Sequence, residues 1–276
     1  MIQTLVRESG ISILRACQAV SMSRAAYYRQ GVDRVGHDAP LIDALNKVVA
    51  KHGRWGFWKC HDRLRLDGHG WNHKRTWRVY CAMKLNLPRR TKKRLVRPRQ
   101  PLEAPRLPNE IWSLDFMSDA LYPGRRFRTL NILDEGVREA LAIEIDTSLP
   151  ALRVVRTLEQ LVAWRGLPKA IRLDNGPELT SQHFTEWCAN KGIELRFIQP
   201  GKPNQNAFIE RFNRSYRTEV LDHWIFDTLE QVREITHSWL RSYNEERPHD
   251  ALGNLPPALY REQLKARKNS TSELST

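Results

Sequence analysis

The order of strand-like and helix-like segments after residue 109 constrains the fold of this chain more than any other feature. Three strand-like runs follow one another, joined by turns that contain YPG and DEG. From residue 150 onward, amphipathic helix-like segments alternate with short strand-like ones. The expected strands cover residues 110–119, 126–134, 138–146, 169–174 and 193–199, and the expected helices cover 150–165, 181–192 and 204–221. This order predicts a mixed α/β domain, over residues 110–225, with helices packed on its sheet.

The first third of the chain predicts helices only. Residues 11–30 have the outline of a helix-turn-helix, with Ser21 and Ser23 as candidate N-caps of the second helix. An ordinary packed helical hairpin is the alternative for this segment. We interpret residues 1–35 as a helix-turn-helix segment.

A second helical unit is expected over residues 36–86. Its helices are predicted at 40–50, 54–67 and 73–85, the last with Asn72 as its N-cap. Four aromatic side chains are interpreted as its core rather than as a platform for stacked bases: Trp55, Phe57, Trp58 and Trp77.

The positive charge of the chain is concentrated in this helical third. Residues 1–107 carry 23 Lys and Arg against 7 Asp and Glu, a net charge of +16, whereas the remainder has a net charge of −2. Such a field attracts polyanions, and DNA is the expected one; a solvated basic surface is the alternative. The candidate DNA contacts here are Arg24, Arg29, Lys74, Arg75 and Arg78.

The remaining segments are connecting or terminal ones. Residues 87–109 combine prolines with a dense basic run, which predicts an extended linker that either follows a DNA backbone or only separates the domains. Residues 226–262 are expected to form a C-terminal helical extension, and the polar residues 263–276 a disordered tail. A run of about 18 apolar residues is missing, so no membrane helix is expected.

Three carboxylates stand where the predicted fold makes them functional. Asp115 interrupts the apolar run IWSLDFM, and a charge buried in a strand needs a partner, a metal or a proton. Asp174 ends a strand, where sites of α/β domains form. Glu210 lies on a helix whose opposite face is apolar, although a surface ion pair with Arg214 is the ordinary use of such a residue.

The spacing and surroundings of these carboxylates resemble those of a known enzyme class. An Asp on a first strand, an Asp closing a later strand and a Glu on the next long helix are typical of ribonuclease H-like polynucleotidyl transferases. The segments WSLDFM, RTLNILDE, RLDNGPE, QPGKPNQNAFIERFNRSYR and YNEERPHDALGNLPPA resemble the successive motifs of retroviral-integrase-type transposases. Together they resemble the catalytic second-frame protein of the bacterial insertion-sequence family that produces its transposase by frameshifting.

This resemblance implies a fold, an activity and a site. The fold is an RNase H-like mixed sheet flanked by helices and preceded by an all-α region. The activity is metal-dependent DNA cleavage at element ends and strand transfer by a 3′-OH. Asp115, Asp174 and Glu210 match the DDE triad that holds two Mg²⁺ ions, or Mn²⁺ in their place, with Asp115 as the bridging ligand.

Other residues are candidates for contacts around that triad. Those expected to contact DNA are Lys202, Asn206, Arg214 and Arg217. Asn175 is expected to form an Asn-Gly turn with its neighbour. Together with Arg247 and His249, it is expected to support the substrate or the fold. The implied partners are double-stranded DNA, further copies of the chain on DNA, and a first-frame helix-turn-helix and leucine-zipper protein, as a separate chain or a frameshift fusion.

Two further expectations concern environment and rival functions. Four widely spaced cysteines predict a protein without disulfides in a reducing cytoplasm, and their spacing does not favour a zinc site. As a DNA-binding protein, the chain is expected to lie near the nucleoid. The rival functions are an RNase H-like, structure-specific nuclease without strand transfer and a DNA-binding regulator without catalysis.

Overall fold

The computed structural model describes residues 2–29, 34–88, 105–199 and 203–273. The chain divides into two compact units, Met1–Asn46 and Lys47–Thr276. Each unit has a core of its own residues.

The first unit contains three short helices, α1 (Ile2–Ser9), α2 (Ile13–Ala19) and α3 (Arg24–Tyr28), and most of a longer fourth helix. Ile2, Ala16 and Cys17 form the buried centre of the three short helices. The predicted helix, turn and helix are confirmed, and the Ser23 side chain caps α3 by accepting a hydrogen bond from the Ala26 N–H at 3.1 Å. Helix α1 was not expected from the sequence.

Helices α4 (Arg34–Lys51), α5 (Phe57–Leu66) and α6 (His73–Ala82) follow. Asn72 caps α6 as predicted, since its side chain accepts a hydrogen bond from the Lys74 N–H at 2.8 Å.

The aromatic core predicted for these helices is half wrong. Trp55 and Phe57 are buried, but Trp58 and Trp77 are 60% and 46% exposed. Each exposed indole directly follows a buried residue of its helix, Phe57 or Thr76. A step of about 100° per residue therefore turns it away from the packed face.

The sheet has five strands: β1 (Ile111–Ala120), β2 (Arg126–Asp134), β3 (Glu139–Asp146), β4 (Ala170–Leu173) and β5 (Glu194–Phe197). Their order is β3-β2-β1-β4-β5, in which β1 to β3 are antiparallel and β4 and β5 run parallel to β1. The predicted mixed α/β domain is confirmed. Because β1 lies between β2 and β4, its side chains occupy the centre of the sheet.

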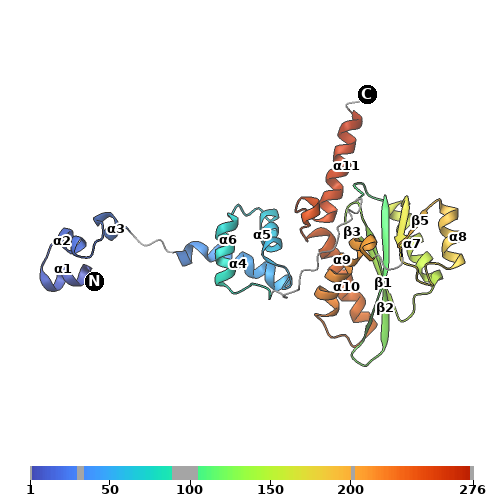
Figure 1. Ribbon diagram of the computed structural model, residues 1–276, viewed down its shortest axis with the longest axis horizontal. Coiled ribbons are helices and arrows are strands. Elements are labelled where there is room, and N and C mark those ends of the chain that lie inside the picture. The colour runs from blue at the N-terminus through green and yellow to red at the C-terminus, as the bar shows by residue number, and fades with distance from the viewer. Residues whose placement is uncertain (1, 30–33, 89–104, 200–202, 274–276) are drawn as a thin grey trace. The chain divides into compact units, whose positions relative to one another are not determined.

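Helices cover both faces of this sheet (Figure 1). Helices α7 (Ala151–Arg165) and α8 (Gln182–Lys191) pack on one face against Trp112 and Leu114 of β1. On the other face lie α9 (Ala207–Tyr216), its π-helical continuation η2 (Arg217–Leu221) and α10 (Leu229–Glu245). Since side chains alternate along a strand, Asp115 points to the α9 face.

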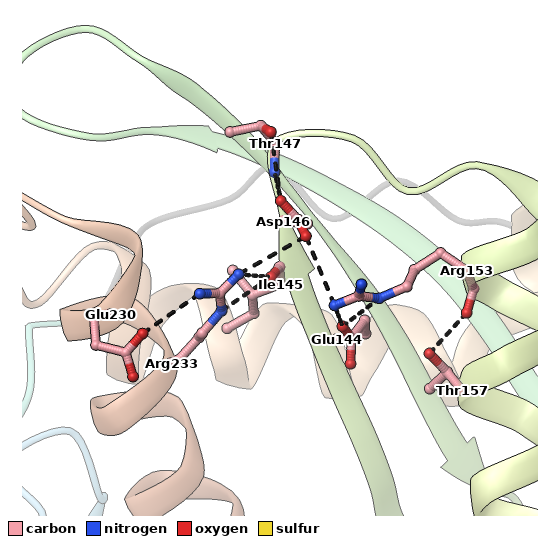
Figure 2. Close-up of polar contacts among 8 residues, drawn as sticks. All are labelled: Glu144, Ile145, Asp146, Thr147, Arg153, Thr157, Glu230 and Arg233. Carbon is pink, nitrogen blue, oxygen red and sulfur yellow. Dashed lines mark hydrogen bonds and ion pairs between the residues drawn. The ribbon is translucent and has the colours of Figure 1, made fainter.

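Charged side chains join helices of both faces to the edge strand β3 (Figure 2). Arg153 of α7 donates to Glu144 at 2.6 Å and lies 3.7 Å from Asp146. Arg233 of α10 donates to the Ile145 carbonyl at 3.0 Å and lies 3.8 Å from the same Asp146. These charges also discourage pairing of the edge with another strand.

The chain ends in α11 (Pro257–Glu273), which follows the short 3-10 turn η3 (Asp250–Leu252). The disordered tail expected from residue 263 is therefore wrong up to Glu273. The run EQLKARK consists of strong helix formers, which explains why the helix continues. Within the described ranges, none of the helices has the length and apolar character that crossing a membrane requires.

Candidate active site

Asp115 lies in the middle of β1 and is half-buried beneath α9. Its Oδ1 accepts a hydrogen bond from the Phe116 N–H at 2.9 Å. Its Oδ2 accepts one from the Asn213 amide of α9 at 2.6 Å. These two donors fix the carboxylate and stabilise its charged form.

Asp174 directly follows Leu173, the last residue of β4. Its Oδ1 accepts a hydrogen bond from the Gly176 N–H at 3.0 Å, which holds the turn after the strand. A Cβ at position 176 would lie 3.1 Å from the same oxygen, so glycine suits this close approach. Asn175 donates to the Ile198 carbonyl at 3.1 Å, so it joins the turn to the segment after β5.

Glu210 lies in the first turn of α9 and is half-buried. The buried neighbours Ile209 and Phe212 pack that helix on the sheet. The predicted amphipathic helix is confirmed in its apolar part, because Tyr216 is buried as well. Phe208 is only partly buried.

Electrostatics link the three carboxylates. Burial, together with the negative charges of Asp174 and Glu210, raises the pKa of Asp115 to about 6, against the hydrogen bonds from Phe116 and Asn213. The three predicted residues thus lie near enough for their charges to interact. A divalent cation would relieve this repulsion, because hard cations bind carboxylate oxygens.

The donor set therefore suits Mg²⁺ or Mn²⁺ by its chemistry. Across residues 2–29, 34–88, 105–199 and 203–273, however, no three His, Cys, Asp or Glu side chains already lie close enough to hold a metal ion.

The Asn213 contact was missed from the sequence. Asn213 is buried, and its Oδ1 accepts a hydrogen bond at 2.7 Å from the amide of Asn131, the residue of β2 opposite Asp115. The sequence placed Asn213 on the solvent side with Glu210. The available signal was a polar residue, Asn131, among apolar neighbours in a central strand.

A second polar group holds the start of α9 and was also missed. Arg172 of β4 donates to the Gln205 carbonyl at 3.1 Å and pairs at 3.1 Å with the buried Glu135. The Ser113 hydroxyl donates to the same Glu135. Gln205 also accepts, at 2.8 Å, a hydrogen bond from the Gln199 N–H, so the two ends of segment 199–205 are joined.

The candidate DNA contacts near α9 are placed differently from one another. Arg214 is exposed, as a DNA contact requires, and Lys202 lies outside the described residues. Asn206 is only 3% exposed and its amide lies 3.5 Å from the Leu114 carbonyl, so burial against β1 removes it from reach of DNA. Arg217 donates to Asp119 of β1 at 2.6 Å and to the Ser118 carbonyl at 2.9 Å, which gives it a structural role.

Arg247 and His249 lie in the segment between α10 and α11. Arg247 is buried and forms an ion pair with Glu219. The ring of His249 packs edge-on against Tyr243, 4.9 Å between centroids. Both residues support the fold here, and they also line a cavity described below.

The candidate contacts of the helical third lie mostly on its surface. Arg24 and Arg29 are exposed at the beginning and end of α3. Lys74 and Arg78 are exposed on α6, and Arg75 is half-buried there.

Known protein families match three parts of the chain. The integrase core domain family matches residues 105–203 and, in a second description, residues 191–257. An HTH-like domain family matches residues 37–94.

Relatives cover nearly the whole chain. The "Insertion element IS476 uncharacterized 39.2 kDa protein" of Xanthomonas euvesicatoria is 40% identical over 94% of this chain and 75% of its own length. The "Insertion element IS407 uncharacterized 31.7 kDa protein" of Burkholderia multivorans is 39% identical over 92% of both chains. Among solved structures, the HTLV-2 integrase catalytic core domain in complex with magnesium is 18% identical, with a TM-score of 0.46, over 56% of this chain and 97% of its own. The assignment therefore rests on the two insertion-element relatives and the matching domains: this chain belongs to the insertion-element transposases that carry an integrase core domain.

Proposed function

We propose that this transposase cleaves DNA at the ends of its insertion element and joins the freed 3′-OH to a target phosphodiester. The proposal rests on the origin of Asp115, Asp174 and Glu210 from β1, the end of β4 and α9, at positions near enough for their charges to interact. Carboxylates so placed suit phosphoryl transfer, where charge on the reacting phosphate must be neutralised.

Mg²⁺ is the proposed cofactor, held as two ions by these three residues, with Asp115 as the shared ligand and Mn²⁺ as a substitute. When bound, the ions supply an activated oxygen nucleophile and neutralise the phosphate and the leaving oxygen. The protein's own groups set the geometry: Asn213 orients Asp115, and the Gly176 N–H orients Asp174.

The helical third is proposed to bind double-stranded DNA of the element ends. Its net charge of +16 supports this, as do the exposed Lys74 and Arg78 on α6, the helix that also exposes Trp77. Further copies of the chain and a first-frame protein with a leucine zipper are the proposed partners on DNA, by the family resemblance.

The chemical proposal is tested with the conservative variants Asp115→Asn, Asp174→Asn and Glu210→Gln. Each keeps the side-chain shape and removes a negative charge, so we expect at least a ~100-fold loss of cleavage and joining, by analogy with the loss of a charge-stabilising group. Glu234→Gln, on an exposed carboxylate of α10, is the matched control and keeps full activity. The readouts are nicking and joining of labelled element ends in Mg²⁺.

These readouts separate the rival functions. Cleavage without joining indicates a nuclease. Metal-independent binding with neither reaction in the wild type indicates a regulator. A triad variant with near-native joining removes that residue from the site.

DNA binding is tested in the full chain without metal. Replacement of both Lys74 and Arg78 by Ala lowers the slope of log affinity against log salt by about two, because each phosphate contact contributes about one. An unchanged slope places the DNA elsewhere on the chain.

A further inference from the structure

A cavity of about 110 Å³ lies beside α9, on a side that does not include Glu210. Its wall comes from α9, the turn between β2 and β3, the end of α10, the turn after α10, and α5. Five of its lining side chains are basic: Lys59, Arg138, Arg211, Arg247 and His249. Proposed catalysis uses none of these groups.

Positive charge exceeds negative charge in this cavity. Asp250 is the single acidic residue among its lining residues, and the charge of Arg247 is balanced by Glu219. Arg211 lines the cavity from α9 and is exposed at its mouth. Glu135 and Asp134, which do not line the cavity, lie near enough to attract Arg138.

Two buried nitrogen atoms of the cavity wall have no hydrogen-bond partner among the described residues: Nη1 of Arg138 and Nε2 of His249. Buried polar atoms are nearly always paired, and Nη1 of Arg138 is a donor, so it requires an acceptor from outside the chain. The Arg138 guanidinium is held in place, since it stacks 3.8 Å over the Phe208 ring. Arg138 also has a φ of +55°, a left-handed conformation that is unfavourable for a non-glycine residue.

The basic groups also repel one another. Burial lowers the pKa of Lys59, and the charge of Arg247 lowers it further. Burial lowers the pKa of His249 well below its ordinary value, and Arg247, Lys59 and Arg211 add to this effect. A bound anion would remove this repulsion.

We propose that this cavity binds a phosphate group, with Arg138 and Arg211 as its principal donors. Guanidinium groups match tetrahedral oxyanions because two N–H groups donate in parallel. The volume is several times the ~30 Å³ that one water molecule occupies, so a single water does not fill it. The phosphate comes from a DNA backbone or from free inorganic phosphate; the DNA source alone rests on the proposed function.

The test is melting of the full chain, without metal, in increasing inorganic phosphate against chloride at equal ionic strength. We expect a saturable rise of the melting temperature in phosphate for the wild type. Arg211→Gln removes an exposed donor, so it folds, and we expect it to bind phosphate about tenfold more weakly, the usual effect of losing one charged hydrogen bond. Arg241→Gln, on an exposed arginine of α10, is the matched control and responds like the wild type.

Arg138→Gly provides a second variant, because glycine relieves the positive φ while it removes the other donor. It too is expected to lose the phosphate response. The salt dependence of DNA binding then identifies the source of the phosphate. If Arg211→Gln lowers the slope of log DNA affinity against log salt by about one, the site binds a backbone phosphate. If the slope is unchanged while the phosphate response is lost, the site binds free phosphate. Equal phosphate responses in all four proteins overturn the proposal, since they show only the general stabilisation by this salt.

Discussion

The contact between Asn131, Asn213 and Asp115 yields the sharpest prediction about stability. Asn213 donates to Asp115 and accepts from Asn131, at 2.6 and 2.7 Å, and both amide side chains are buried. The Oδ1 of Asn131 has no partner among the described residues. Asn213→Leu therefore removes the donor of a carboxylate and leaves the Asn131 amide unpaired at both ends.

The magnitude follows from these two losses. A hydrogen bond to a charged group contributes about 1.5–3 kcal/mol, and a buried unpaired amide costs roughly 1–3 kcal/mol. Asp115 is half-buried, so water replaces part of the first loss, and the leucine adds apolar burial. We expect Asn213→Leu to lower the free energy of unfolding by about 2–4 kcal/mol.

A double-mutant cycle tests whether the two amides interact. Asn131→Leu together with Asn213→Leu removes the orphaned amide, so the pair is expected to cost about 1–2 kcal/mol less than the sum of the single changes. Urea unfolding without metal, followed by near-UV circular dichroism, measures all four proteins. Additivity within about 0.5 kcal/mol refutes the buried hydrogen bond between the two amides.

Three further predictions test other parts of the core by thermal melting. Gly136→Ala would place a Cβ 2.0 Å from the Leu107 carbonyl oxygen, so we expect a loss of at least about 3 kcal/mol; a wild-type melting temperature contradicts this packing. Burial raises the pKa of Glu139 from 4.5 to about 7, so the folded state holds the extra proton and stability falls as pH rises through this range. Glu139→Gln flattens that fall, and an unchanged pH profile disproves the assignment. Arg217→Ala and Asp119→Asn each lower stability by about 1 kcal/mol or less, because they break one half-buried ion pair; loss of DNA binding without loss of stability returns Arg217 to a DNA role.

The elements of the catalytic core were predictable because local signals agreed with each other. The predicted segments match β1, β2 and β3, and the predicted helix over 181–192 matches α8, which has Ser181 as its N-cap and Gly192 in the left-handed conformation after it. Strand order was not predictable from such signals. Pairing of β1 with β4 joins residues about 60 positions apart, and only tertiary packing selects that neighbour.

The three carboxylates were singled out for another reason. Asp115, Asp174 and Glu210 were found by their resemblance to a motif, since spacing alone does not distinguish a metal ligand from a surface acid. Their proximity follows once β4 lies beside β1 and α9 lies across the sheet. The surrounding polar groups stayed hidden, because Arg172 and Gln205 meet only in the folded chain.

Arg217 shows that a helical wheel gives the face of a side chain but not its position along the helix axis. The wheel placed it beside Glu210, because seven steps of about 100° return almost to the same line. At ~1.5 Å per residue, however, Arg217 lies about 10 Å further along the helix than Glu210. The guanidinium then meets Asp119, a residue 98 positions earlier in the chain, instead of the site. Arg211 lies one step around from Glu210 in the same helix. The same helix therefore presents a carboxylate to the proposed catalytic site and a guanidinium to the proposed phosphate cavity, and phosphate bound at Arg211 would hold α9 in the position that Glu210 requires.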